Sequence, residues 1–275
     1  MKKTILLAFT AALSITASVA QNKPRTYAKL IYNNVEVTDN ASVTISIQSA
    51  VANDKQVKFK LKVVNKTNDF ILVKFNECKF KCGDVVGVPT EKDLLISPIE
   101  NDFRIVNVNG VFNSSEHCQF LMDGVYKISS KGNGVTAPDF KLPSPTTEFS
   151  AGPFNITNTD IYKQSDATKL KFNVVYTGKK TGFIFINKPT VLMPDNVEYP
   201  CNKPSGLFAG PALIMIKAGT STSYDVSWDR MPGGNLNDMQ KVNMLVKWHD
   251  TFCELDPAKE NTITIPFDIN VGESK

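Results

Sequence analysis

The chain holds only two histidines, His117 and His249, and they limit the nucleophilic chemistry that it can support. A Ser-His-Asp hydrolase needs an imidazole that a carboxylate orients, beside an activated hydroxyl. Asp250 follows His249 directly, and adjacent side chains on an extended strand point to opposite faces, so this carboxylate is badly placed to hold the ring. The G-x-S-x-G turn of many hydrolases is absent from the sequence. We therefore expect no histidine-based hydrolase and no catalytic residue.

Paired carboxylates are the second chemistry to consider, because glycoside hydrolases place two of them about 5–10 Å apart. Whether two carboxylates meet at that distance depends on the tertiary fold, and solvated loop carboxylates are the favoured interpretation. A carbohydrate-active hydrolase with paired carboxylates at a domain junction remains the alternative function. The candidate residues are Glu91, Asp93, Glu100, Asp102, Glu116, Asp123, Asp225 and Asp229.

Two short segments combine an aromatic ring with hydrogen-bonding groups, and they are the candidate ligand-binding residues. They are Trp228-Asp229-Arg230 and Trp248-His249-Asp250, each at the end of an expected strand. Tryptophan beside such groups can hold a sugar or a peptide anchor. Phe208 joins them because it lies in a long irregular stretch, and such stretches are often functional. The competing interpretation, favoured for both tryptophans, is that they fill the core of a β-sandwich.

Five cysteines bear on the redox compartment, and their odd number leaves at least one unpaired within the chain. We expect Cys118 to pair with Cys82 or Cys78, and Cys201 to pair with Cys253. A disulfide closing either loop would contribute about 4 kcal/mol by chain entropy. A zinc site formed with His117 is disfavoured because paired C-x-x-C ligands are missing. We expect neither a metal nor a cofactor.

Alternating apolar and polar residues dominate the sequence and predict an all-β protein. Residues 57–63 read Val-Lys-Phe-Lys-Leu-Lys-Val, which places four apolar side chains on one face and Lys58, Lys60 and Lys62 on the other. These lysines could meet an anionic glycan or membrane, but keeping a sheet face wet is the favoured role. A turn or two of helix is expected around residues 235–242. The other expected strands are residues 43–47, 70–75, 103–108, 125–129, 170–176, 183–186, 212–216, 224–228, 242–248 and 262–269.

An internal repeat predicts two domains. Residues 57–73 align without gaps on residues 170–186 at an offset of 113, with five identities that include Phe59 on Phe172 and Phe70 on Phe183. A proline-rich stretch, residues 142–153, cannot supply the donors of a central strand and is the expected boundary. We therefore predict a first β-sandwich domain over residues 21–146 and a second over residues 147–275.

Residues 1–20 predict a cleaved signal peptide, because a basic start is followed by a short apolar run and by small residues ending at Ala20. Without Lys2 and Lys3, 29 basic residues face 27 acidic ones, a near-balance that argues against a nucleic-acid-binding protein. No later segment is long and apolar enough to span a membrane. The expected location is the periplasm, the cell surface or the medium.

The alternating strand, Asn65-Lys66-Thr67 and Phe70-Ile71-Leu72 together resemble the immunoglobulin-like domains of many exported bacterial proteins, as does the glycine turn at Gly219 before residues 224–228. The resemblance implies tandem immunoglobulin-like antiparallel β-sandwiches that serve in adhesion, assembly or ligand binding, and it carries over no catalytic residue. The expected function is an exported non-catalytic module whose loops bind a protein or carbohydrate at the cell envelope. A filament subunit that exchanges strands, with residues 26–34 as donor, is a further alternative.

Overall fold

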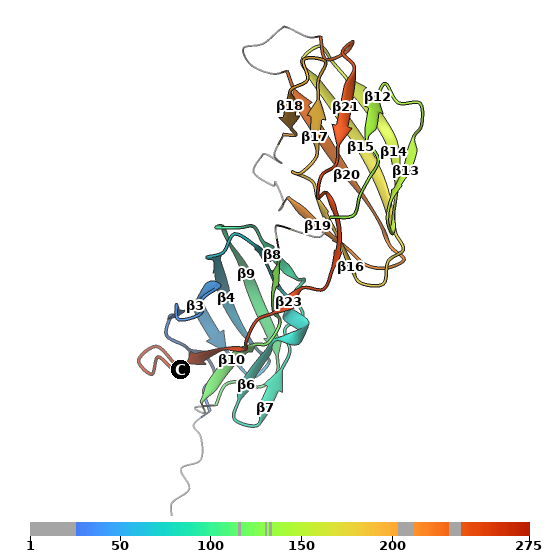
Figure 1. Cartoon of the computed structure of the whole chain (residues 1–275). Helices are drawn as coiled ribbons and strands as arrows, with labels where there is room; N and C mark the ends of the chain where they lie inside the picture. The colour runs from blue at the N-terminus through green and yellow to red at the C-terminus, as the bar shows by residue number, and fades with distance from the viewer. Residues whose placement is uncertain (1–25, 115–116, 130, 132–133, 203–211, 231–237) are drawn as a thin grey trace, which may run out of the picture.

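The structure is a computed structural model that describes residues 26–114, 117–129, 131, 134–202, 212–230 and 238–275. The expected signal peptide and Phe208 lie outside the described residues, as do residues 235–237 of the expected helical turn. The rest of that turn is described, and there residues 239–241 form a hydrogen-bonded turn instead of a helix. The described residues form antiparallel β-sheets and one 3₁₀ turn, Phe75–Glu77, so the expected all-β class is confirmed. Figure 1 shows the sheets gathered into two groups, which we call the first and the second lobe.

The first lobe packs one long sheet against two shorter ones. The long sheet has the order β1-β3-β4-β9, with β2 also paired to β3. The facing sheets have the orders β24-β10-β6-β7 and β23-β11-β5-β8. The bounds are β1 Leu30–Ile31, β2 Val35–Val37, β3 Val43–Ala52, β4 Gln56–Asn65, β5 Phe70–Val73, β6 Lys79–Cys82, β7 Val85–Gly87, β8 Leu94–Ile96, β9 Asn101–Asn109, β10 Cys118–Met122, β11 Val125–Ile128, β23 Ala258–Lys259 and β24 Ile263–Phe267.

The second lobe also has one long sheet, with the order β13-β14-β15-β20, and two shorter ones with the orders β12-β21-β17-β18 and β19-β16-β22. The bounds are β12 Phe140–Leu142, β13 Glu148–Ala151, β14 Phe154–Lys163, β15 Ala167–Tyr176, β16 Thr181–Phe185, β17 Thr190–Leu192, β18 Glu198–Pro200, β19 Leu213–Ile216, β20 Ser221–Asp229, β21 Met244–Lys247 and β22 Phe252–Leu255.

The repeat seen in the sequence places equivalent aromatic rings at the centre of each lobe. Phe59 on β4 packs edge-on against Phe120 and Phe267, with ring centroids 5.2 Å apart in both pairs. Phe172 on β15 packs edge-on against Trp248 at the same centroid distance. Strands β4 and β15 begin and end 111 residues apart rather than 113. The two offsets differ by two residues, so both keep the same side chains inside.

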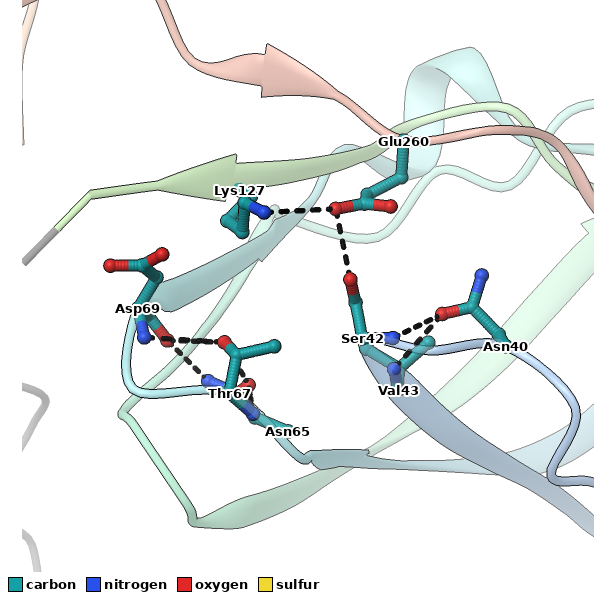
Figure 2. Close-up of polar contacts among 8 residues, drawn as sticks. All are labelled: Asn40, Ser42, Val43, Asn65, Thr67, Asp69, Lys127 and Glu260. Atoms are coloured by element: carbon teal, nitrogen blue, oxygen red, sulfur yellow. Dashed lines mark hydrogen bonds and ion pairs between the residues drawn. The ribbon is translucent and has the colours of Figure 1, made fainter.

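The chain returns to the first lobe at its C-terminal end. Strand β24 pairs with β10 along its whole length, and β23 pairs with β11. Figure 2 shows Glu260, between these strands, accepting a hydrogen bond from Ser42 Oγ at 3.0 Å and lying 4.0 Å from Lys127 Nζ. On β24 the burial alternates, so that Ile263, Ile265 and Phe267 enter the first-lobe core. The strand pairing therefore differs from the expected division: residues 258–267 belong with the first lobe, and β12 at residues 140–142 pairs in the second.

The two lobes meet through a third apolar cluster that uses the outer faces of equivalent strands. On β5, Ile71 and Val73 face the first-lobe core, whereas Phe70 and Leu72 face the second lobe. On β16, Phe183 and Phe185 face back, and the rings of Phe70 and Phe185 lie 5.9 Å apart. Burial on both faces explains the uninterrupted Phe-Ile-Leu-Val run of β5, which an amphipathic strand does not show.

Of the two expected disulfides, the first is confirmed and the second is wrong. Cys82 on β6 and Cys118 on β10 are direct cross-strand partners and are bonded. Cys201 and Cys253 are both buried free thiols. Cys201 and Phe252 both belong to the second-lobe core, whereas Cys253, the residue after Phe252, points into the cluster between the lobes. Because adjacent residues on a strand face opposite ways, a β22 that buries Phe252 in the core turns Cys253 away from Cys201. Cys78, the alternative partner of Cys118, is also a buried free thiol.

Candidate functional site

The structure places both tryptophans in the second-lobe core. Trp228 and Trp248 are 0% and 2% exposed, and Trp248 stacks on Phe149 at a centroid distance of 5.1 Å. Neither indole N–H has a hydrogen-bond partner among the described residues, so packing alone holds the rings. The prediction that these rings form a ligand-binding platform is therefore wrong, because Trp228 on β20 and Trp248 directly after β21 both point into the core and leave no ring face for a ligand.

The polar residues beside the tryptophans lie apart from one another. The Arg230 side chain donates to the Ser165 carbonyl, with Nε 3.1 Å from the oxygen, so it closes the turn between β14 and β15. Asp229, the last residue of β20, is exposed. Asp250 is exposed in the turn after β21, and its carbonyl accepts from the Cys253 thiol at 3.5 Å. Because Cys201 and Cys253 are unbonded, no disulfide links Cys201, which follows β18, to the segment that follows Trp248.

Among the ligand-binding candidates that the structure describes, His249 is the residue that meets other polar side chains in a cluster. Its Nε2 contacts Glu198 Oε1 from β18 and lies 3.0 Å from Thr190 Oγ1 on β17. The Thr190 hydroxyl also donates to Glu198 Oε1. A catalytic triad needs the carboxylate on one ring nitrogen and the hydroxyl on the other. Here both groups meet the same nitrogen, so the three residues are not arranged as a triad. The imidazole is half exposed, and the cluster links β17, β18 and the turn after β21.

The cluster makes stability depend on pH in a defined direction. The pKa of Glu198 lies below its usual range because the Thr190 hydroxyl, and then His249, hydrogen-bond its charged form. A carboxyl whose pKa is lower when folded stabilises the fold above its unfolded value of about 4.3, and this contribution is lost as the pH falls through the folded pKa. Glu198→Gln should thus lower the free energy of unfolding at neutral pH, by less than about 1 kcal/mol because the carboxylate is exposed.

Urea unfolding of wild type and Glu198→Gln, at neutral pH and at about pH 3, measures this effect. The difference in unfolding free energy between wild type and Glu198→Gln should disappear at about pH 3. Glu148→Gln, at an exposed position on β13, is the control and should show no such dependence. A difference for Glu198→Gln that is equal at both pH values would contradict the assignment.

A second polar site lies on the outer face of the second lobe's long sheet. An open hollow of about 1080 Å³ extends over β15 and β20. Ligand sites typically measure about 300–1000 Å³, and this open hollow lies just above that range. A smaller hollow beside it, of about 320 Å³, reaches Asp160 and Tyr162 on β14. The larger one is lined by Lys169, Lys171, Ile186, Asn202, Ile214, Ser223, Tyr224, Asp225, Ser227 and Asp229.

The strand register explains how these residues come together. Asp160, Lys171 and Asp225 are cross-strand neighbours in one row over three strands. Lys169 reaches diagonally to Asp225, with Nζ 2.6 Å from Oδ2. A register shift between Asn158 and Asp160 marks a bulge in β14, and bulges commonly redirect a side chain beside a site.

Of the hollow's lining, sequence reasoning named Asp225 and Asp229 as candidate carboxylates, and Asp229 also as a ligand-binding residue beside Trp228. The signal was present, because Lys169 and Lys171 alternate with the buried Leu170 and thus had to share the outer face. What sequence could not show was that Asn202 and Ile214, from outside the sheet, would close the hollow.

Within the described ranges, no group of histidine, cysteine, aspartate and glutamate side chains is arranged to hold a metal ion. Over the same residues, no helix has the length and apolar character needed to cross a membrane. No family model matches the chain, and neither a curated protein nor a solved structure does.

Proposed function

We propose that this protein is an exported, non-catalytic binding module that holds a carbohydrate in the hollow over β15 and β20. In this proposal the two lobes are tandem immunoglobulin-like sandwiches that work at the cell envelope. The observation that carries the proposal is the lining of the hollow, which mixes charged and short polar side chains with two isoleucines.

Sugar hydroxyls both donate and accept hydrogen bonds, so a sugar site needs both kinds of partner close together. Lys171 and the Asn202 amide supply donors, whereas Asp225 and Asp229 supply acceptors. Ile186 and Ile214 supply apolar surface for the C–H faces of a pyranose ring. A protein partner of standard size would need a larger and more apolar surface than this hollow offers.

The same carboxylates are poorly arranged for cleavage. Asp225 and Asp229 are four residues apart on one strand, which separates their Cα atoms by about 13 Å. Glycosidases of either stereochemistry keep their two carboxyl groups within about 9.5 Å. The Asp225 carboxylate is also already paired with Lys169, with Nζ 2.6 Å from Oδ2. The arrangement therefore favours binding over turnover.

Screening of purified protein on a glycan array, followed by calorimetry on the best glycan, tests the proposal. Lys171→Met and Asp225→Asn should each weaken binding about tenfold or more, since each leaves a polar partner unpaired. Lys217→Met, at an exposed position outside the hollow, should leave affinity unchanged. Release of reducing ends from the bound glycan, or binding that survives both substitutions, would overturn the proposal.

A further inference from the structure

The outer face of the first lobe's long sheet carries an unusual combination of side chains, which we call the lysine face. It consists of Lys58, Lys60 and Lys62 on β4, beside Phe103 and Ile105 on β9. Phe103 is 52% exposed and Ile105 is 49% exposed. Alternate residues on a strand lie about 6.7 Å apart, so the three lysines form a regular row of positive charge.

The charges of this row are not neutralised by the sheet itself. The cross-strand neighbours of Lys60 are Gln48 and Ile105, and those of Lys62 are Ser46 and Phe103. Among the described residues, none of the three lysines forms an ion pair. Glu36 on β2 and Glu91, which accepts from Asn107, border the face at its margins.

The equivalent strand of the second lobe shows the opposite arrangement. There Lys171 lies between Asp160 and Asp225, and Lys169 is paired with Asp225. If lysines served only to keep a sheet face wet, paired and unpaired rows would do equally well. The unpaired row, next to two exposed apolar side chains, instead points to a ligand that supplies negative charge.

A lipid surface fits the face poorly. The Lys60 ammonium lies over the Phe103 ring, 4.4 Å from its centroid, so it stands above β9. Insertion of this ring into hydrocarbon would carry the ammonium with it or break the contact, and burying an unpaired charge is costly. The ring can still contact a sugar at its exposed edge while the ammonium binds an acidic group of the same sugar.

A peptide that adds as a further strand beside β9, at the edge of the sheet, is also a poor candidate for the ligand. The N–H groups of Phe103 and Asn107 point away from β4, because Gly110 N donates to Lys55 O and Asn65 N donates to Glu100 O. Two of these outward groups already have acceptors: Phe103 N donates to Asp102 at 2.7 Å, and Asn107 N donates to Glu91 at 2.7 Å. Edge carboxylates of this kind discourage the pairing of an added strand with β9.

We propose that the lysine face binds a linear acidic polysaccharide, whose carboxylate or sulfate groups meet Lys58, Lys60 and Lys62 while a sugar ring packs on Phe103. This site is separate from the hollow of the second lobe, so either proposal can fail while the other stands.

Binding of oligogalacturonate, measured by calorimetry at low and high salt, tests the lysine face. The triple variant Lys58→Gln, Lys60→Gln, Lys62→Gln should lose about tenfold or more in affinity and most of the salt dependence. The control triple Lys79→Gln, Lys81→Gln, Lys217→Gln removes the same charge from other exposed positions and should bind nearly as wild type does. A triple lysine-to-arginine variant of the face should retain binding, and Phe103→Ala should weaken it with the salt dependence intact.

The outcomes distinguish an acidic polysaccharide from the other possible ligands. Equal losses in the two glutamine triples would show a general charge effect and overturn the site. No binding of oligogalacturonate or of a sulfated glycan, tighter binding to phosphatidylglycerol vesicles, or tighter binding to an acidic peptide would each overturn the polysaccharide as ligand. Each variant is first compared with wild type by circular dichroism and thermal unfolding, and these surface substitutions should leave both unchanged.

Discussion

Replacing Ile265 with aspartate should unfold the first lobe although this residue lies only ten positions from the C-terminus. Ile265 is 0% exposed on β24 and packs in the core of a lobe formed mainly by residues 30–125. The substitution removes the buried apolar surface of the isoleucine and places an unpaired charge there, which together should cost about 4 kcal/mol or more. Thr264→Asp introduces the same group one residue earlier, on the exposed side of the strand, and should change stability by less than about 1 kcal/mol.

The two tryptophans make this prediction specific to one lobe. Both lie in the second-lobe core, so tryptophan fluorescence reports the unfolding of that lobe. Hydrogen exchange of β3, β4 and β10 reports the first. Ile265→Asp should speed exchange in those strands and leave most of the fluorescence transition in place. Loss of the fluorescence transition together with unchanged exchange in the first lobe would show that residues 258–267 stabilise the second lobe instead.

Removal of the Cys82–Cys118 disulfide should produce the second large effect. The bond closes a separation of 36 residues, so its loss should lower the free energy of unfolding by about 4 kcal/mol. The double variant Cys82→Ala, Cys118→Ala makes the change without a reductant. Its matched control is Cys201→Ala, Cys253→Ala, which removes two buried thiols and leaves the closed loop intact.

Guanidinium unfolding followed by far-ultraviolet circular dichroism compares the two variants. The control variant should lose less free energy of unfolding, since each of its substitutions creates only a small cavity. Thiol titration of the denatured, unreduced wild type should find three free cysteines, namely Cys78, Cys201 and Cys253. A count of one free thiol would mean that Cys201 and Cys253 are bonded, which would contradict the structure.

Burial explains why thiol reactivity in the folded state should be low. The pKa of each free thiol, Cys78, Cys201 and Cys253, is raised to about 11, and desolvation is the largest cause in every case. At neutral pH these thiols are thus protonated, and the thiolate is the reactive form. Cys253 should react only when the apolar contact between the lobes opens.

Local sequence pattern determined many of the strands and their inward faces. The alternation over residues 57–63 predicted β4 with the correct side chains buried, and the repeat correctly placed Phe59 and Phe172 on the inward face of their strands. This works because side-chain direction on a strand follows from the chain alone. The three-residue strands β7, β17 and β18 were missed, since three residues carry too little alternation to detect. The longer β10 and β14, of five and ten residues, were missed as well.

Only the tertiary structure decided which strands are neighbours. Alternation says that residues 262–269 form a strand but not that this strand pairs with β10, more than 140 residues earlier. The same reason explains the cysteines: Cys253 was expected to reach Cys201, but the pairing of β22 with β16 turned it towards the other lobe. The hollow over β15 and β20 likewise depends on residues that meet across strands. Pairing between distant segments depends on the free energy of the whole core, which no local window of sequence contains.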